Sequence, residues 1–595
     1  MKKIKFLTVM AVVTGLLLMN SCSEDFLNIT PNGSLDAQVL GTYEGVDALL
    51  IGAYSLLDGY WNQGGWGPAS SGWVYGSIRG MEANKGTDSG DQPDINPIQT
   101  YTETATNPYL NDKWRAVYEG VSRCNSTILT AAVALDNGTM TQAEYDMIIA
   151  QARALRGVYH FWAFKLWGDL NTGMYIPYVD ENTDPATVTN DVDVRPSIIE
   201  DITAGTSLPL DMKQIGRFNK TVCQVFLAKA YMQMYQDYNS ALPLLNEVVA
   251  SGTQPAGGEI GLNDTYGEIF DIEQRNCKES VYTVQYSVND NGGAWNAGYG
   301  EVLNFPYKSG GSPGGCCGFF NPTQDFVNSF NTSGGLPLID LANQTYSYNT
   351  VMVTSDQGLT PSDPYTTYAG ELDPRLDWSA GRRGIPYWDW GRHTGSDWIR
   401  DQTYSGPYSP KKQVYKQSQE GSYTDVTSWT SGYTANGYRM IRYADVLLLK
   451  AECEAMTNSD DLGFGEVNQI RARAANPAGW VLDIDADGND IPGVYAANYV
   501  INEYPTPFAN SAEAMHAIKF ERKLELGQEG HRYYDLQRWG EVVSELTRIM
   551  TFEKTMPWTN LLYAGADIGP EDVNFPVPQR QIDVSNNILI QNSTH

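Results

Sequence analysis

Apolar residues spaced three and four positions apart constrain the fold of this chain more than any other sequence feature. Between positions 148 and 166 they fall at Ile148, Ala152, Leu155, Tyr159, Trp162 and Leu166. On a helix of 3.6 residues per turn these positions share one face, which predicts a buried helix ending at Gly168. The same spacing recurs at 222–235, 240–250, 438–456 and 511–527, the last with Ser511 as its expected N-cap. We therefore expect a mainly α-helical scaffold.

Two of these helices are predicted to form a pair. Only the short turn Asp237-Tyr238-Asn239 separates 222–235 from 240–250, and Pro243 falls in the first turn of the second helix, where proline is tolerated. A helix pair of this length resembles one tetratricopeptide repeat, a unit that buries its apolar face by stacking on neighbouring units. We expect further helices to cover this pair.

The middle of the chain has a different pattern. Residues 280–287 predict a strand, and the sequence that follows is rich in glycine, proline, serine and aromatic residues but has few helical stripes. Loops of this length in a compact protein are functional or disordered, and the many aromatic residues favour an ordered, functional part. We expect one domain over 22–595, with a helical scaffold at about 36–255 and 436–595 and a loop-rich insert at about 256–435.

The first residues resemble a lipoprotein signal peptide. Lysines at positions 2, 3 and 5 precede an apolar run that is too short for a comfortable membrane span. The sequence Met19-Asn20-Ser21-Cys22 is similar to a bacterial lipobox, which implies cleavage after residue 21 and acylation of Cys22. Ser23-Glu24-Asp25 resembles the surface-export signal of Bacteroidetes lipoproteins. The alternative is ordinary signal cleavage beside an incidental cysteine.

Charge and composition narrow the class of ligand. The formal net charge of −30 disfavours nucleic acid, whose phosphates the chain would repel. The chain has 37 tyrosines and 15 tryptophans, and such side chains offer a flat apolar face with a polar edge. These properties suit sugar rings, although many secreted proteins are also rich in aromatic residues.

The six cysteines after Cys22 are scattered and show no metal-binding spacing. Cys124, Cys223 and Cys453 lie in helical patterns and are expected to be buried thiols. Cys316 and Cys317 are adjacent in a glycine-rich loop, where a vicinal disulfide would stiffen the backbone.

Eight blocks, taken together and in order, resemble the SusD/RagB family of outer-membrane nutrient-binding lipoproteins. They are RALRGVYHFWAFKLWGDLN (153–171), KESVYTVQYS (278–287), NPTQDFVNSF (321–330), DPRL (373–376), YRMIRYADVLLLKAECEA (438–455), VNQIRARA (467–474), ERKLELGQEGHRYYDLQRWG (521–540) and FPVPQRQIDVSNN (575–587).

This resemblance implies a fold, a location and a function. The fold would be a tetratricopeptide-like helix-pair scaffold with a loop-rich ligand-binding part and a few short strands. The protein would be anchored to the outer membrane by lipid alone, facing the cell surface. It would capture a glycan without cofactor or catalysis and deliver it to a SusC-like TonB-dependent transporter. The alternatives are a binding protein for peptides or another nutrient, and a secreted glycoside hydrolase.

The stretch 527–540 has the composition of an active site. His531 lies one helical turn before Asp535, a spacing that suits an acid–base pair or half of a metal site. No catalytic motif accompanies it. We interpret the stretch as structural, with Arg522, Arg532 and Arg538 pairing with nearby carboxylates.

The segment DIDADGNDI (483–491) resembles the start of a calcium loop. Asp483, Asp485 and Asp487 alternate, and Gly488 supplies the turn. The position that a calcium loop fills with glutamate is Val494 here. A structural calcium site and a simple Asp-Gly hairpin therefore both remain open.

Three aromatic loops, the first at 60–75, the second at 288–300 and the third at 385–398, are candidates for the ligand site, because none has helical spacing and each is rich in small or polar residues. The predicted aromatic platform is Trp66, Trp73, Tyr75, Trp295, Tyr299, Trp388 and Trp390. The predicted polar partners are Asn289, Asn291, Asn296, Asp389 and Arg392. The resemblance favours Trp73 and Trp295 among the aromatic residues.

Overall fold

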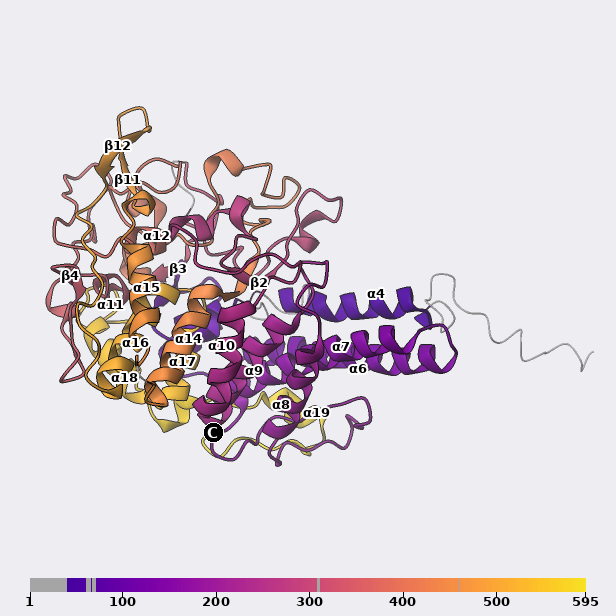
Figure 1. Cartoon of the computed structure of the whole chain (residues 1–595). Helices are drawn as coiled ribbons and strands as arrows, with labels where there is room; N and C mark the ends of the chain where they lie inside the picture. Colours follow the sequence, from indigo (N-terminus) through magenta and orange to yellow (C-terminus); the bar gives the residue numbers. More distant parts are fainter. Residues whose placement is uncertain (1–39, 60–65, 67–70, 308–310, 460) are drawn as a thin grey trace, which may run out of the picture.

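The computed structural model describes residues 40–595 apart from 60–65, 67–70, 308–310 and 460. The expected signal peptide and Cys22 lie outside these residues. The described part is mainly helical, as predicted, with short strands in antiparallel pairs (Figure 1). Its helices of ten or more residues are α4 (Tyr43–Tyr54), α6 (Pro108–Asp136), α7 (Gln142–Trp167), α8 (Arg195–Ala204), α9 (Lys220–Tyr235), α10 (Tyr238–Ser251), α14 (Tyr443–Met456), α15 (Phe464–Ala474), α16 (Ser511–Leu526) and α18 (Val542–Glu553).

Shorter helices lie between and after these. They are α5 (Ile95–Thr100), α11 (Gln324–Asn328), α12 (Leu376–Ser379), α13 (Gln402–Ser405), α17 (Arg532–Trp539) and α19 (Gln579–Val584). The strand pairs are β1 (Ala83–Gly86) with β3 (Phe319–Pro322), β2 (Ser280–Val284) with β10 (Tyr438–Arg442), β4 (Thr332–Ser333) with β5 (Leu336–Pro337), β6 (Ile339–Asp340) with β7 (Thr345–Tyr346), β8 (Ala380–Gly381) with β9 (Ser409–Pro410), and β11 (Leu482–Ile484) with β12 (Asp490–Tyr495).

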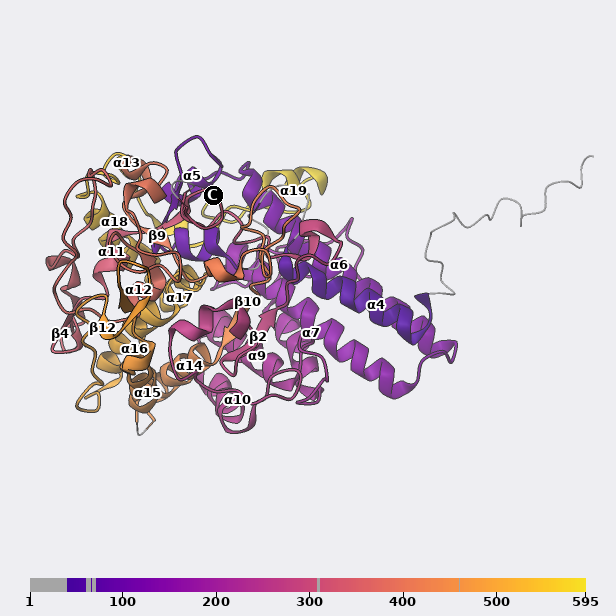
Figure 2. The same ribbon diagram turned by 90° about the horizontal axis from the view of Figure 1, so that it is seen from above.

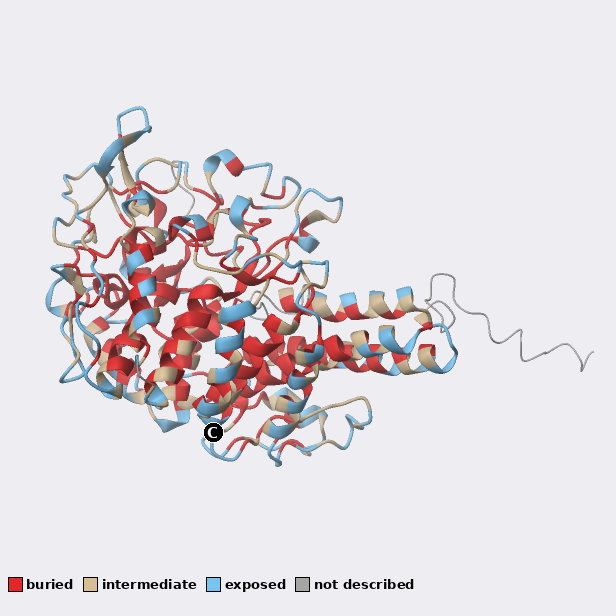
Figure 3. Cartoon of the chain, viewed as in Figure 1, coloured by how far each residue is buried: buried red, intermediate tan, exposed pale blue. Residues whose placement is uncertain are grey.

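The helices form a layered scaffold. Helices α4, α6 and α7 lie side by side as an arm that projects from the body, and α8, α9 and α10 continue the layer (Figures 1 and 2). Buried residues run from the body into α6 and α7, whereas the tip of the arm is largely exposed or half-buried (Figure 3). The predicted stop at Gly168 is confirmed, since Gly168 follows the last residue of α7.

Three predicted boundaries were wrong. Helix α10 begins at Tyr238 and not at 240, so Pro243 lies inside the helix and not in its first turn. Asn510 caps α16 through bonds to the N–H groups of Ala512 and Glu513, so Ser511 is the first helical residue and not the cap. The predicted helix over 438–456 begins only at Tyr443, because its first five residues form β10 and pair with β2. The predicted strand at 280–287 forms over Ser280–Val284.

The loop-rich insert packs on the helices through several buried clusters. A main core extends from Ala53 to Leu589, and a second one joins insert residues such as Phe326 and Tyr408 to Phe520 and Leu524 of α16. The cysteines at 124, 223 and 453 are buried thiols, as expected, and Cys316 is joined to Cys317 by a disulfide. In the described ranges no helix is both long and apolar enough to cross a membrane.

Two glycines bring distant parts of the chain into backbone contact. Residues Trp73–Ile78 form a π-helical turn, and a Cβ on Gly76 would lie 2.0 Å from the carbonyl oxygen of Gly530. Gly530 itself has a φ of +82°, a conformation that favours glycine. A hydrogen bond also joins the two segments, because the Ser77 hydroxyl accepts from the Gly530 N–H. The same hydroxyl donates to Glu82. Neither glycine leaves room for a side chain.

A buried carboxyl beside α11 predicts pH-dependent stability. Burial raises the pKa of Glu553 from 4.5 to about 8, and one carboxyl oxygen accepts from the Asp325 N–H at 2.7 Å. The folded state therefore keeps a proton that the unfolded chain loses above about pH 4.5, so this group's stabilising effect falls as pH rises towards 8. We expect Glu553→Gln to be more stable than wild type at pH 8 by at least about 1 kcal/mol, and this gain to shrink at pH 5.

Urea unfolding at both pH values measures this difference. Glu273→Gln, at an exposed position, serves as the matched control and should change little at either pH. An equal effect of Glu553→Gln at pH 5 and pH 8 would contradict the assignment of a raised pKa.

Candidate functional site

The polar stretch 527–540 belongs to a buried ion-pair network. Glu525 accepts from Arg375 at 3.0 Å, from Arg442 at 3.0 Å and from Arg473 at 2.5 Å, and all four side chains are at most 4% exposed. Burial alone would raise the pKa of Glu525, but the three guanidinium groups outweigh it and hold that pKa below its ordinary value. Glu529 accepts from Arg442 and from Lys412 at 2.7 Å. Every carboxylate oxygen in this pair of residues has a cationic partner.

The neighbouring residues are also structural. Asp535 accepts from Arg522 at 2.8 Å and from Arg538 at 3.0 Å, as predicted, whereas Arg532 pairs with Glu545 instead. Asp535 therefore forms ion pairs with two arginines and does not form an acid–base pair with His531.

His531 lines a small interior cavity of about 70 Å³, and burial lowers its pKa to about 4. The carboxylates of Asp445, Glu529 and Asp535 act on this imidazole through their charge, and each of them is already paired with lysine or arginine. Among the described residues, no group of three or more His, Cys, Asp or Glu side chains is placed to hold a metal ion.

The predicted calcium ligands do not converge. Asp483 pairs with Arg392 at 2.5 Å, and Asp485 accepts the N–H groups of Asp487 and Asn489 within its own turn. The segment forms the hairpin β11–β12, with Gly488 at a φ of +86°. The segment therefore has the Asp-Gly hairpin that was one of the two alternatives, with two of its carboxylates used in a salt bridge and a turn, and calcium binding stays an untested prediction.

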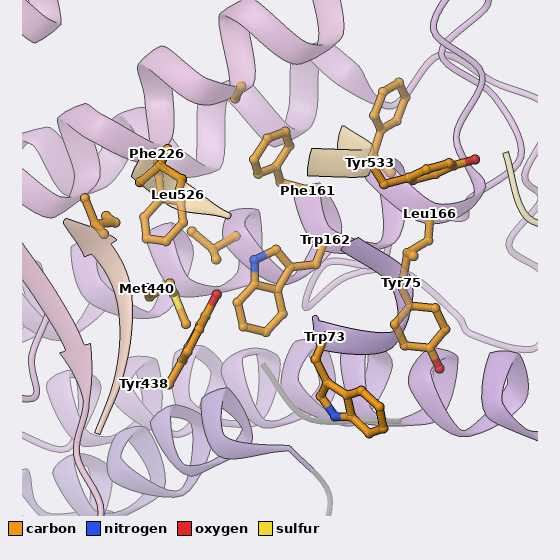
Figure 4. Close-up of a cluster of buried hydrophobic side chains, with 14 of the residues drawn as sticks. Trp73, Tyr75, Phe161, Trp162, Leu166, Phe226, Tyr438, Met440, Leu526 and Tyr533 are labelled. Carbon is orange, nitrogen blue, oxygen red and sulfur yellow. The ribbon is translucent and has the colours of Figure 1, made fainter. Parts of the chain in front are cut away.

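The first aromatic loop is mostly buried. Trp73 is 3% exposed and packs edge-on against Phe319 and Phe320, while Tyr75 is fully buried and donates to the Tyr109 carbonyl at 2.8 Å. Figure 4 shows both among core side chains of α7, α9 and β10. The expectation that they form an exposed platform was wrong, because their segment is the π-helical turn that docks on Gly530.

An aromatic cluster joins the second aromatic loop to residues 429–433. It consists of four residues in ring contact, Trp66, Tyr299, Tyr433 and Trp429; together with Trp295, which is exposed on the loop of Tyr299, we call them the Trp295–Trp429 cluster. Trp66 stacks on Tyr299 with ring centroids 6.1 Å apart, and Tyr299 stacks on Tyr433 at 6.4 Å. Trp429 meets Tyr433 edge-on at 6.0 Å. Tyr299 and Tyr433 are buried, whereas Trp295 is 52% and Trp429 61% exposed. Sequence analysis missed Trp429, which lies outside the three aromatic loops taken as candidates.

The polar residues of this loop hold its shape. Asn289 donates to the Gly421 and Thr424 carbonyls and accepts from the Val426 N–H, and so joins the loop of Trp295 to the loop of Trp429. Asn296 donates to Asp290, and hydrogen bonds from Ser287 and Asn296 lower the pKa of that carboxyl to about 2. Asn291, with a φ of +68°, is exposed. Asn289 and Asn296 thus help to shape the loop, and their contact with a ligand stays a prediction.

The loop that contains the Cys316–Cys317 disulfide is hydrogen-bonded to the loop of Trp429. The Gly314 carbonyl, two residues before Cys316, accepts from the Thr430 hydroxyl, and the Gly314 N–H donates to Tyr415 at 2.9 Å. Thr430 follows Trp429 directly. The loop that carries the more exposed tryptophan is therefore fixed to a disulfide-stiffened segment.

The third aromatic loop divides between a pocket and the interior. Trp388 and Asp389 line a pocket of about 530 Å³, although the Asp389 carboxylate accepts from the Gln417 and Ser418 N–H groups. Trp390 donates to the Tyr415 carbonyl at 2.9 Å and is half-buried. Arg392 donates to Asp483 and to the Ile484 carbonyl and so holds the β11–β12 hairpin, and its contact with a ligand stays a prediction.

Comparisons with known proteins agree with the fold. Residues 278–595 match the model of the SusD family. SusD-like protein P25 of Formosa agariphila is 22% identical over 497 residues, which cover 82% of this chain and 79% of that protein. A SusD-like protein of Bacteroides ovatus is 23% identical over 289 residues, 47% of this chain and 49% of the relative.

Solved structures give the same result. Surface glycan-binding protein A of Bacteroides fluxus is 19% identical with a TM-score of 0.64, over 93% of this chain and 100% of that one. The protein of the same name from Bacteroides thetaiotaomicron, in complex with laminarihexaose, is 19% identical with a TM-score of 0.61 and the same coverage. A laminarin-binding SusD-like protein is 19% identical with a TM-score of 0.62, again over 93% and 100%. At these identities the likeness establishes the fold.

The ion-pair network predicts which carboxylates matter for stability. Replacing Glu525 with Gln leaves three buried guanidinium groups without their shared charge, so we expect the free energy of unfolding to fall by about 3–5 kcal/mol. Denaturant titration measures this loss. Asp264→Asn, which removes the exposed partner of Lys278, is the matched control and should cost at most about 1 kcal/mol. Comparable losses in the two variants would contradict a dominant role for the buried network.

Proposed function

The chain belongs to the SusD family, and we propose that it is a surface lipoprotein that binds a glycan and delivers it to a SusC-like TonB-dependent transporter. The observation that carries glycan binding is the presence of two exposed indoles, Trp295 and Trp429, on loops that Asn289 joins, with Trp429 packed on the stacked rings of Tyr433 and Tyr299. Flat exposed rings suit the C–H faces of sugars, and their fixed loops lower the entropy cost of binding.

The polar surroundings favour a neutral glycan. Hydrogen bonds from Ser287 and Asn296 occupy Asp290, and Thr427 and Ser428 occupy Asp425. Both carboxylates are thus engaged by their own loops, and the cluster offers chiefly ring faces and neutral groups to a ligand. Two structurally similar proteins, described as laminarin binding and as a complex with laminarihexaose, support this class of ligand.

The same proposal assigns no chemistry to the protein. The acids of 527–540 are bound in buried ion pairs. The stretch that most resembles an active site therefore offers no free acid–base pair. Capture without cleavage leaves the glycan intact for transport.

Removal of either exposed indole is expected to weaken glycan binding. At on the order of 1–3 kcal/mol per stacked aromatic, by analogy with base stacking, Trp295→Ala and Trp429→Ala should each raise the dissociation constant at least fivefold. Affinity electrophoresis on a panel of neutral polysaccharides, followed by calorimetry on those that retard the protein, measures the effect. Tyr235→Ala, at an exposed aromatic of α9, is the matched control and should bind as wild type.

Two outcomes would overturn this proposal. One is that no polysaccharide of the panel retards the wild-type protein. The other is that the tryptophan variants bind as tightly as the Tyr235 control. A reducing-sugar assay on the same polysaccharides should show no turnover, and release of sugar by the pure protein would favour the hydrolase alternative.

Membrane attachment is proposed to depend on Cys22. In cells, Cys22→Ala should leave the protein in the soluble fraction, because acyl chains contribute roughly 0.8 kcal/mol per buried methylene and the variant has none. Fractionation, with protease treatment of intact cells to test surface exposure, gives the readout. A variant that still sediments with the outer membrane would exclude the lipid anchor as the attachment.

A further inference from the structure

The pocket of about 530 Å³ lies apart from the Trp295–Trp429 cluster. Its walls come from residues 265–271, the loop 386–391, Trp480 and the β11–β12 hairpin, and no aromatic residue of the cluster lines it. The hairpin stands out from the body near α12 and α15 (Figure 1). Arg392 fixes the hairpin at this position by its bonds to Asp483 at 2.5 Å and to the Ile484 carbonyl at 2.7 Å.

Three tryptophans line the pocket, and hydrogen bonds to backbone carbonyls hold two of them. Trp378 donates to the Gly479 carbonyl at 2.8 Å, and Trp480 donates to the Ala474 carbonyl at 3.0 Å. Trp388 packs on Trp378 with ring centroids 5.1 Å apart and planes at 58°. The rings are therefore fixed before a ligand arrives, which reduces the entropy that binding would cost.

The charges around the pocket disfavour an anionic ligand, and lysine side chains already lie against two of its rings. Lys411 lies 5.0 Å from the Trp378 ring and Lys416 lies 5.5 Å from the Trp388 ring, so the protein's own cations already use the attraction of these rings. Asp271 neutralises Lys416 at 2.5 Å. The exposed carboxylates of Glu268 and Asp490 on the pocket wall repel an anion.

We propose that this pocket is a second carbohydrate-binding site, which takes the terminal one or two sugars of a neutral glycan. Its volume lies within the roughly 300–1,000 Å³ range of small-ligand sites and suits a disaccharide. Because the pocket has walls on several sides, it can hold the end of a glycan chain. The exposed Trp295–Trp429 cluster, in contrast, can contact sugars in the middle of a chain. The choice of a sugar rests on the proposed glycan-binding function; the site itself rests on the pocket.

The experiment uses the whole soluble domain and five disaccharides: maltose, cellobiose, laminaribiose, xylobiose and mannobiose. Calorimetry and tryptophan fluorescence measure binding to wild type and to Trp480→Ala, Trp295→Ala and Val494→Ala. We expect at least one disaccharide to bind, Trp480→Ala to weaken it at least fivefold, and Trp295→Ala to leave it within twofold. Val494 lies on the same hairpin but outside the pocket, so Val494→Ala should behave as wild type.

The outcomes separate this proposal from the one above. If no disaccharide binds, or if Trp480→Ala binds as wild type, the second site is overturned, while polysaccharide binding that depends on Trp295 would still stand. If disaccharides bind through Trp480 and no polysaccharide is retarded, the second site stands and the proposed capture of long glycans fails. Arg392→Ala releases the hairpin and leaves all three tryptophans in place, so it should also weaken disaccharide binding. It provides a second test if Trp480→Ala folds poorly. Unchanged affinity for the disaccharide in both variants would overturn the site.

Discussion

The position of the loop-rich insert depends on one buried carboxylate. Glu525, at the end of α16, binds Arg375 from the insert together with Arg442 and Arg473 from the scaffold. The cost of desolvating so many charges offsets much of their mutual attraction, so the network adds little net stability. A single arrangement of the side chains, however, pairs all of the charges. The network thus fixes where the insert lies on the helices, and with it the loops that carry Trp388 and Trp429.

The surface loops are then shaped by hydrogen bonds of their own residues. Asn289 joins two loops, Asp290 closes a turn, and the Gly314 carbonyl holds the segment after Trp429. These bonds lie within or beside the loops and do not involve the charged interior. Ligand-contacting residues and fold-determining residues are therefore largely separate sets in this protein.

The helices were predictable because their apolar spacing reports burial directly. Helices α7, α9, α10 and α16 lie where the stripes placed them, and the stop at Gly168 was correct. The strand β10 was missed because YRMIRY fits the start of a helical stripe, and only its partner β2, more than 150 residues away, stabilises it as a strand. Long-range pairing of this kind leaves no local signal.

The site was less predictable, because exposure depends on what covers a loop. Trp73 and Trp295 both lie near glycines, yet one packs under Phe319 and Phe320 while the other is half exposed. The contact that buries Trp73 is its segment's approach to Gly530, which the sequence of neither segment indicates alone. Trp429 and Trp480 were overlooked because both lie outside the three aromatic loops that were taken as candidates.

The contact between Gly76 and Gly530 has a consequence for how the protein can diversify. Two segments more than 450 residues apart touch through bare backbone, so neither can accept a larger residue without separating the halves of the molecule. The loops at 288–300 and 420–433 take no part in this contact. New ligand preferences are therefore accessible through changes in loop length and sequence there, while the junction beneath them stays invariant in shape.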